Sequence, residues 1–199
     1  MKTSHVTALT LSLFSLTIVA CTNNKPQKPT TVDRTSREST ASAILKSIAT
    51  SDWQRLSSFA TEAGVRFTPQ TNVNVTSDRV LSPSDIAHFE HDETVYTWGI
   101  QDGSGLPIEM TNAEYLARYI WDHDFRTAPE VRWNAVQDHG SMIDNVQDVY
   151  PGATTIEYHF PGFDEQYGGM DWRSLRLVLA QGDDGNWMLY GVIHDEWTP

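Results

Sequence analysis

The sequence predicts an α+β fold in which N-terminal helices pack on a curved antiparallel sheet within one domain. Three observations lead to this prediction: two amphipathic helical patterns open the domain, an alternating hairpin pattern lies in its middle, and three β-rich runs separated by turn residues close it. The closing runs leave no room for a crossover helix, so their strands should be antiparallel neighbours.

The first two helices are indicated by spacing and by a capping signal. Arg37 marks the expected start of order, followed by a helical stripe; Ser51 with Gln54 fits a capping box for the second helix. The apolar positions expected to face the sheet are Ala41, Ile44, Leu45, Ile48, Trp53, Leu56, Phe59 and Ala60.

The middle of the chain should alternate short strands and short helices. We expect strands at residues 64–68, 94–100, 106–110 and 130–136. Ser82, followed by Pro83, and Thr111, paired with Glu114, are helix-starting signals. Residues 141–149 form a weaker helical pattern that stops before Pro151.

The three closing strands are expected at residues 153–160 and on both sides of the turn at residues 182–185. Either a two-residue or a four-residue loop would place Gln181 opposite Asn186. Counting outward pairs Leu177 with Tyr190. The same count pairs Arg173 with His194 and Asp171 with Glu196.

This register defines a candidate pocket on one face of the last two strands, made of Asp171, Arg173, Tyr190, His194 and Glu196. Arginine can clamp a carboxylate, and a histidine beside a carboxylate can act as an acid or base. Charged strand ends that reach water give the same pattern, so both interpretations stay open. The opposite face is more mixed in composition and is expected to be solvated.

The N-terminus predicts export and a lipid anchor. A run of fifteen mostly apolar residues, 6–20, lies after Lys2 and directly before Cys21, the only cysteine. That length suits a signal peptide and is too short for a membrane span. The sequence Ile18-Val19-Ala20-Cys21 resembles the lipobox of bacterial lipoproteins, a class in which the cysteine becomes the acylated N-terminus. A lipidated Cys21 leaves no thiol for a disulfide or a metal site.

The expected organisation is therefore a signal peptide at residues 1–20, the lipidated cysteine and a flexible tether at residues 21–35, and one domain at residues 36–199. The tether prediction follows from polar residues and two prolines without an apolar period. The expected location is the cell envelope. Because Thr22 rather than aspartate follows the cysteine, the lipoprotein pattern implies the outer membrane, facing the periplasm, in a Gram-negative cell.

Charge and motifs exclude several function classes. The formal net charge of −12 and the absence of a Lys/Arg cluster argue against a nucleic-acid partner. No phosphate-binding glycine loop, dinucleotide fingerprint or nucleophile elbow occurs, so no cofactor is expected. His88 and His91 have helical spacing but no predictable third ligand, and no metal site is predicted.

Several segments resemble a family of uncharacterised bacterial exported proteins with the architecture of the NTF2-like (SnoaL-like) cone. They are residues 64–69, 96–99, 102–105, 158–164, 169–174 and 193–198, and together they span most of the mature domain. The resemblance implies export and a sheet covered by helices. It supplies no catalytic residues.

Two functional hypotheses remain open. The first is a non-catalytic lipoprotein domain that binds a small ligand or an envelope protein. The alternative is an acid/base enzyme, an isomerase, cyclase or hydrolase, that uses His194 with Asp171 or Glu196. A deep enclosed pocket would favour the enzyme, whereas a filled core with exposed apolar side chains would favour the binding domain.

Overall fold

The computed structural model describes residues 34–135 and 143–197. The predicted signal peptide, Cys21 and the tether as far as Asp33 lie outside the described residues. The first helix begins at Arg34, inside the segment that we expected to be tether.

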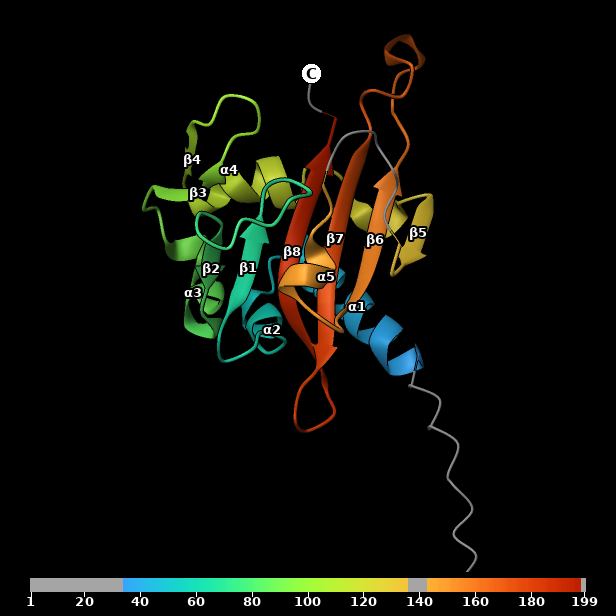
Figure 1. Cartoon of the computed structure of the whole chain (residues 1–199). Coiled ribbons are helices and arrows are strands. Elements are labelled where there is room, and N and C mark those ends of the chain that lie inside the picture. The colour runs from blue at the N-terminus through green and yellow to red at the C-terminus, as the bar shows by residue number, and fades with distance from the viewer. Residues whose placement is uncertain (1–33, 136–142, 198–199) are drawn as a thin grey trace, which may run out of the picture. The chain divides into compact units, whose positions relative to one another are not determined.

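The described chain contains a six-stranded sheet and a separate two-stranded hairpin (Figure 1). The strand order in the large sheet is β2-β1-β8-β7-β6-β5. The strands are β1 (Val65–Thr68), β2 (Arg79–Leu81), β3 (Tyr96–Ile100), β4 (Pro107–Met110), β5 (Glu130–Trp133), β6 (Thr154–Phe160), β7 (Arg173–Gln181) and β8 (Trp187–Glu196).

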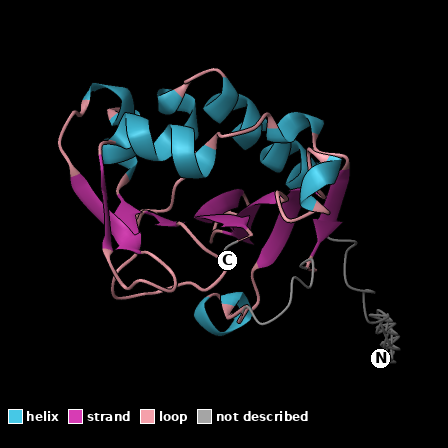
Figure 2. Ribbon diagram, turned by 90° about the horizontal axis from the view of Figure 1, so that it is seen from above, coloured by secondary structure: helices cyan, strands magenta, loops and turns pink. Residues whose placement is uncertain are grey.

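The helices lie mainly on one side of the sheet. They are α1 (Arg34–Ala49), α2 (Trp53–Ser57), α3 (Pro83–Ala87), α4 (Asn112–Tyr115) with a wider turn at Leu116–Ile120, and α5 (Val146–Val149), with short 3-10 turns at Phe89–His91, Phe125–Thr127 and Glu165–Tyr167. Seen from above, most helices form one layer over the strands, and a short helix lies on the opposite side (Figure 2).

This arrangement confirms the predicted α+β fold with helices packed on a sheet. One feature differs from the prediction: the sheet is mixed, because β1 runs parallel to β8 and antiparallel to β2. The meander β6-β7-β8 is antiparallel throughout, as predicted.

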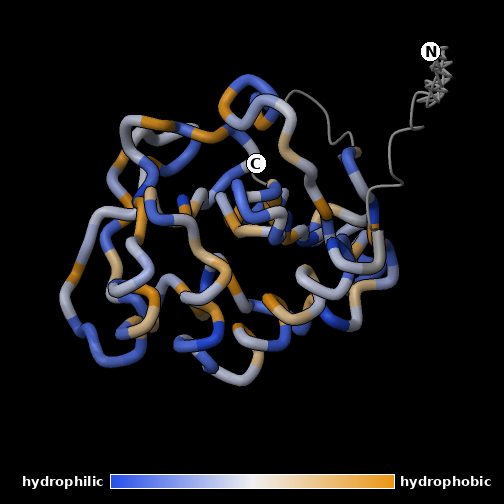
Figure 3. The backbone as a smooth tube through the Cα atoms, turned by 90° about the horizontal axis from the view of Figure 1, so that it is seen from below, coloured by the Kyte–Doolittle hydropathy of each residue, from blue (hydrophilic) through white to orange (hydrophobic). Residues whose placement is uncertain are grey.

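The main core fills the space between the sheet and the helical layer. The helical stripe Ala41, Ile44, Leu45 and Ile48 is at most 3% exposed and packs against apolar side chains of the sheet. Figure 3, which colours the chain by hydropathy, shows apolar and polar stretches alternating along it. Fully buried aromatic side chains dominate this space: Trp98 stacks on Tyr115 with ring centroids 3.8 Å apart, and Phe89 and Phe125 are also buried.

Local capping signals were correct at two of three helices. Ser82 and Thr111 each form a capping box, with Asp85 and Glu114 respectively. The prediction for α2 is wrong, because Asp52 rather than Ser51 is the N-cap and accepts a hydrogen bond from the Arg55 amide. Ser51 instead has a left-handed backbone with φ of 51°.

The predicted register of β7 and β8 is also wrong, because the turn shifts the pairing by one residue and a bulge in β8 shifts it by one more. Gln181 faces Trp187, and beyond the bulge Arg173 faces Glu196 and Leu175 faces His194. Leu189 is paired with Leu179 and Gly191 with Val178, so Tyr190 is the additional residue. The sequence around the turn carries no signal for this insertion.

Candidate functional site

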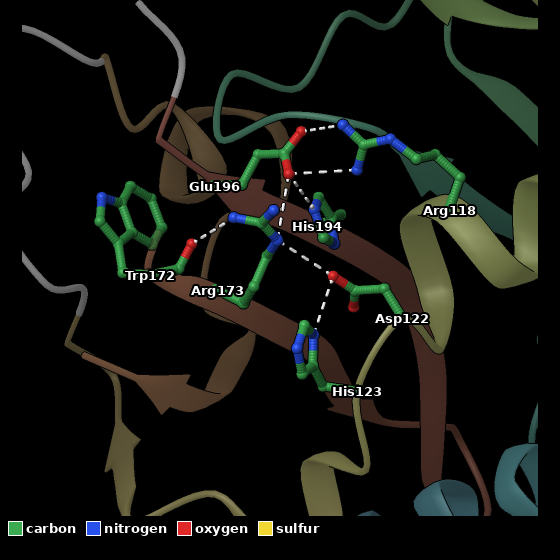
Figure 4. Close-up of polar contacts among 7 residues, drawn as sticks. All are labelled: Arg118, Asp122, His123, Trp172, Arg173, His194 and Glu196. Atoms are coloured by element: carbon green, nitrogen blue, oxygen red, sulfur yellow. Dashed lines mark hydrogen bonds and ion pairs between the residues drawn. The ribbon is translucent and has the colours of Figure 1, made fainter. Parts of the chain in front are cut away.

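The structure keeps three of the five predicted pocket residues together. Arg173, His194 and Glu196 project from the helix-covered face of β7 and β8, because the displacement beyond the bulge preserves the alternation of faces. Their meeting point lies beside the segment that follows α4 (Figure 4).

The other two predicted residues lie elsewhere. Tyr190 packs with Val178 and Ile193 in a smaller apolar cluster on the opposite face, since the bulge reverses its direction. Asp171 precedes β7, and its Oδ2 accepts the amide hydrogens of Phe163 and Asp164 at 3.0 and 2.8 Å. Asp171 therefore shapes a loop and does not pair with Glu196.

An ionic cluster forms around Arg173 and Glu196 (Figure 4). The Arg173 Nε lies 3.1 Å from Glu196 Oε2 and 3.1 Å from Asp122 Oδ2. Arg118 binds both oxygens of Glu196 through its two terminal nitrogens. His123 Nδ1 lies 3.1 Å from Asp122 Oδ2. Two arginines therefore face two carboxylates, and their formal charges balance.

Burial in this cluster is graded. The Arg173 and Glu196 side chains are 24% and 11% exposed, whereas that of Arg118 is 44% exposed. Burial opposes ionisation of Glu196, but the adjacent His194 ring and the Arg118 guanidinium lower the pKa of Glu196 to about 2. Glu196 is thus held as a carboxylate that is already neutralised by protein groups.

His194 is placed for packing more than for proton transfer. Its side chain is fully buried, and its ring meets Tyr119 edge-on with centroids 5.6 Å apart. Its Nε2 is 3.7 Å from Glu196 Oε2, which exceeds hydrogen-bond distance. Neither ring nitrogen has a hydrogen-bond partner within the described chain. Because Tyr119 and the aromatic core pack around His194, they leave no path by which a substrate could reach its ring nitrogens.

Sequence reasoning missed the partners that come from outside the meander. Arg118, Asp122 and His123 follow α4 and lie at least 50 positions before Arg173 in the sequence. One signal was available: Arg118 and Asp122 are four residues apart, the spacing that places opposite charges on one helical face. That spacing does not say which strand the pair will meet.

A second polar cluster lies buried on the opposite face of the sheet, and it overturns the prediction that this face is solvated. Arg176, Glu157 and Asp195 are 2%, 1% and 6% exposed. The Arg176 Nη1 lies 3.2 Å from Asp144 Oδ2, and its Nη2 lies 3.9 Å from Glu157 Oε1. Part of the cover comes from α5, which packs Val146 against this face.

The same cluster contains a buried histidine–serine pair. His159 Nδ1 and Ser174 Oγ are 2.7 Å apart, and both residues are 1% exposed. A serine beside a histidine is the geometry of an activated nucleophile. Their burial leaves no route for a substrate in the described conformation, so we interpret the pair as structural.

A cavity of about 420 Å³ is lined by residues that belong to neither cluster. It is formed by the loop after β1, the end of β3 and Ile143, and is lined by Pro69, Gln70, Asn72, Asn74, Ser77, Asp78, Ile100, Asp102 and Ile143. A carboxylate, Asp78, points into it, and its Oδ2 accepts hydrogen bonds from the Thr68 hydroxyl and the Asn74 amide at 2.8 Å each. Burial raises the pKa of Asp78.

None of the helices in residues 34–135 and 143–197 is both long and apolar enough to cross a membrane. Within the same ranges, no three His, Cys, Asp or Glu side chains gather in a way that could hold a metal ion.

Comparisons with known proteins give a likeness of fold and little else. No protein family model matches the sequence, and no curated protein matches it. ActVI-ORFA from Streptomyces coelicolor aligns over 81% of this chain and 95% of its own length, with 13% identity and a TM-score of 0.35. A putative calcium/calmodulin-dependent protein kinase II association domain from Xanthomonas campestris aligns over 80% and 84%, with 11% identity and a TM-score of 0.37. At these values the likeness says nothing about activity.

Proposed function

We propose that this chain is a bacterial lipoprotein whose domain binds a small ligand or an envelope protein and catalyses no reaction. The anchor is acylated Cys21, supported by the lipobox-like Ile18-Val19-Ala20-Cys21. Several acyl chains on one cysteine would hold the protein stably, since each buried methylene contributes about 0.8 kcal/mol. Thr22 supports transfer to the outer membrane of a Gram-negative cell, where the domain would face the periplasm.

The observation that carries the binding function is the filled interior. The space between helices and sheet is occupied by Trp98, Tyr115 and other buried aromatic side chains. The polar end of that space holds an ionic cluster in which Arg173 is already paired with Asp122 and Glu196. A ligand carboxylate that enters this cluster must displace one of those two side chains.

The acid/base enzyme is the weaker candidate for the same reason. His194 is fully buried against Tyr119, and Asp171, one of its two proposed partners, belongs to a different loop. General acid–base chemistry needs the reacting proton within hydrogen-bond reach of the catalytic group. The cavity of about 420 Å³ is not lined by His194.

The anchor is tested by Cys21→Ser. Wild-type protein should partition into detergent and incorporate labelled fatty acid, whereas the variant should appear in the soluble fraction without label. Thr22→Ser is the matched control and should stay membrane-bound. Equal membrane binding of Cys21→Ser and wild type would show that the lipoprotein assignment is wrong.

The binding function is tested with protein purified from its native membrane under mild conditions. Mass spectrometry should detect a small molecule or an envelope protein that co-purifies in a fixed ratio. Arg173→Ala tests whether the ionic cluster takes part, because the variant would lose a ligand that pairs with this guanidinium. Turnover of any co-purified compound would contradict the non-catalytic assignment.

A further inference from the structure

The loop between β6 and β7, residues 161–171, presents large apolar side chains to solvent. Phe163, Tyr167 and Met170 are 48%, 49% and 50% exposed. The loop extends beyond the ends of the two strands that it connects (Figure 1). Isolated exposed apolar residues are ordinary, but three within eight positions form a patch that calls for an explanation.

Hydrogen bonds hold the conformation of this loop, because Asp171 at its end binds backbone amides near its start. Oδ2 of Asp171 accepts the amide hydrogens of Phe163 and Asp164. Asp164 in turn accepts the Gln166 amide hydrogen at 2.9 Å and starts the 3-10 turn Glu165–Tyr167. Gly168, with φ of 59°, ends that turn in a left-handed conformation.

Gly162 shows how closely the two ends approach each other. Its φ is 149°, and a Cβ at this position would lie 3.0 Å from Asp171 Oδ1 and 3.2 Å from the Cα of Gly169. Only glycine fits this crossing without a shift of the backbone. The sequence therefore specifies the loop conformation, although the loop is exposed.

The base of the loop is attached to the body of the domain through an aromatic contact. The Phe163 ring stacks on His123 with centroids 4.1 Å apart and an interplanar angle of 16°, and it lies 5.3 Å from the Phe160 ring. About half of the Phe163 side chain stays exposed. A surface that is ordered before binding loses less conformational entropy when a partner binds.

The charges around the apolar side chains select the partner. Asp164, Glu165 and Asp171 lie in the loop, and residues 161–171 contain no lysine or arginine. Aromatic residues and methionine are enriched in the centres of protein interfaces, and charged rims steer association. The acidic rim also opposes an anionic lipid surface, which attracts basic segments.

We propose that residues 161–171 are a docking loop for a protein that presents an apolar pocket rimmed by lysine and arginine. The proposal rests on the non-catalytic binding function above and specifies its surface. Tyr167 and Met170 enter the pocket, and the exposed Asp164 and Glu165 pair with its rim.

The first experiment uses the full-length protein in cells. A photoreactive benzoylphenylalanine replaces Tyr167 or Met170, and Leu106, 61% exposed in the β3–β4 turn, is the matched control position. Both loop positions should cross-link the same protein, and position 106 should not. A lipid adduct, an equal adduct from position 106, or no protein adduct from the loop would overturn the proposal.

The second experiment measures affinity with the cross-linked protein after its purification. Replacing both loop side chains, Tyr167→Ser with Met170→Ser, should weaken binding at least tenfold without changing the thermal midpoint, since both are half exposed. Glu165→Gln should slow association and reduce its dependence on NaCl. Asp171→Ala keeps the apolar side chains but releases the loop, and should weaken binding as well.

The outcomes separate this proposal from the broader function. A partner that binds the double variant as tightly as wild type disproves the docking loop but leaves a binding domain. If no cross-linking position yields a protein and no ligand co-purifies, the binding function itself is wrong.

Discussion

Asp195 and Glu196 are neighbours in β8, yet the sheet sends their carboxyl groups to opposite faces, where their pKa values shift in opposite directions. Burial raises the pKa of Asp195 to about 7, despite hydrogen bonding from Thr71 and the charge of Arg176. On the other face, His194 and Arg118 outweigh burial and lower the pKa of Glu196 to about 2. Two identical chemical groups thus contribute to stability in different pH ranges.

The first prediction concerns Asp195 and neutral pH. Because its folded pKa is raised, its stabilising contribution is fully present below the unfolded value near 3.8 and is lost as the pH rises through about 7. The shift corresponds to roughly 4 kcal/mol as an upper limit. Asp195→Asn should flatten the fall in unfolding free energy between pH 4.5 and 8, measured by urea melts. An unchanged slope would contradict the assignment.

Glu196 should act at acidic pH. Because its folded pKa is lowered, its contribution is fully present above the unfolded value of 4.5 and is lost as the pH falls through about 2. Glu196→Gln should therefore reduce the unfolding free energy at pH 5 and make little difference near pH 1.5. Urea melts at these two pH values, with wild type in parallel, decide the point.

The ionic cluster predicts a cost for losing its central cation. Arg173→Ala leaves Asp122 and Glu196 without their shared partner in a partly buried site, and should cost about 2 kcal/mol, between the costs of breaking an exposed and a buried pair. Arg126 is the matched control, because it pairs with Asp124 on the exposed surface. Arg126→Ala should leave the denaturation midpoint within error. Equal effects would mean that the cluster is solvated.

Gly64 should tolerate no side chain. Its φ is 93°, and a Cβ would lie 2.6 Å from the Leu81 carbonyl oxygen, between β1 and β2. Gly64→Ala should cost more than about 2 kcal/mol, because backbone must move as well as adopt a strained conformation. Gly103 has φ of 72° with no atom near its Cβ position, so Gly103→Ala isolates the conformational part, about 1 kcal/mol. Thermal melts of both variants give the comparison.

The start of α2 distinguishes two interpretations of the same segment. In the structure Asp52 caps the helix, so Asp52→Ala should cost about 1 kcal/mol. Ser51→Ala should change stability by less than about 0.5 kcal/mol. If Ser51→Ala cost more stability than Asp52→Ala, the capping box expected at Ser51 and Gln54 would be correct after all.

Local features of the fold could be predicted and non-local ones could not. The caps at Ser82 and Thr111, and the stripe from Ala41 to Ile48, depend on residues three or four positions apart. The predicted register failed because the turn shifts the pairing by one residue and the insertion at Tyr190 shifts it by another, and neither shift has a signal in the sequence. Arg173, His194 and Glu196 still share one face only because the pairing beyond the bulge is shifted by two residues. A shift by an even number of residues keeps each side chain on its predicted face.

For the candidate site, too, only the local part could be predicted from the sequence. Alternation along β7 and β8 identifies which strand residues can meet, but Arg118 and Asp122 arrive from a distant segment. The buried face around Arg176 and Glu157 was misjudged because its composition is polar. Nothing in a strand's own sequence reveals that α5, elsewhere in the chain, will cover it.

The position of β8 has a consequence for how the protein is made. The last strand of the chain lies between β1 and β7, so it joins the two halves of the sheet. A growing chain that lacks Trp187–Glu196 has a β1–β2 pair and a β5-β6-β7 ribbon with no strand between them. Long-range pairing of this kind also slows folding. The sheet therefore closes only after Trp187–Glu196 has been synthesised, and a proteolytic cut within this strand would separate its two halves.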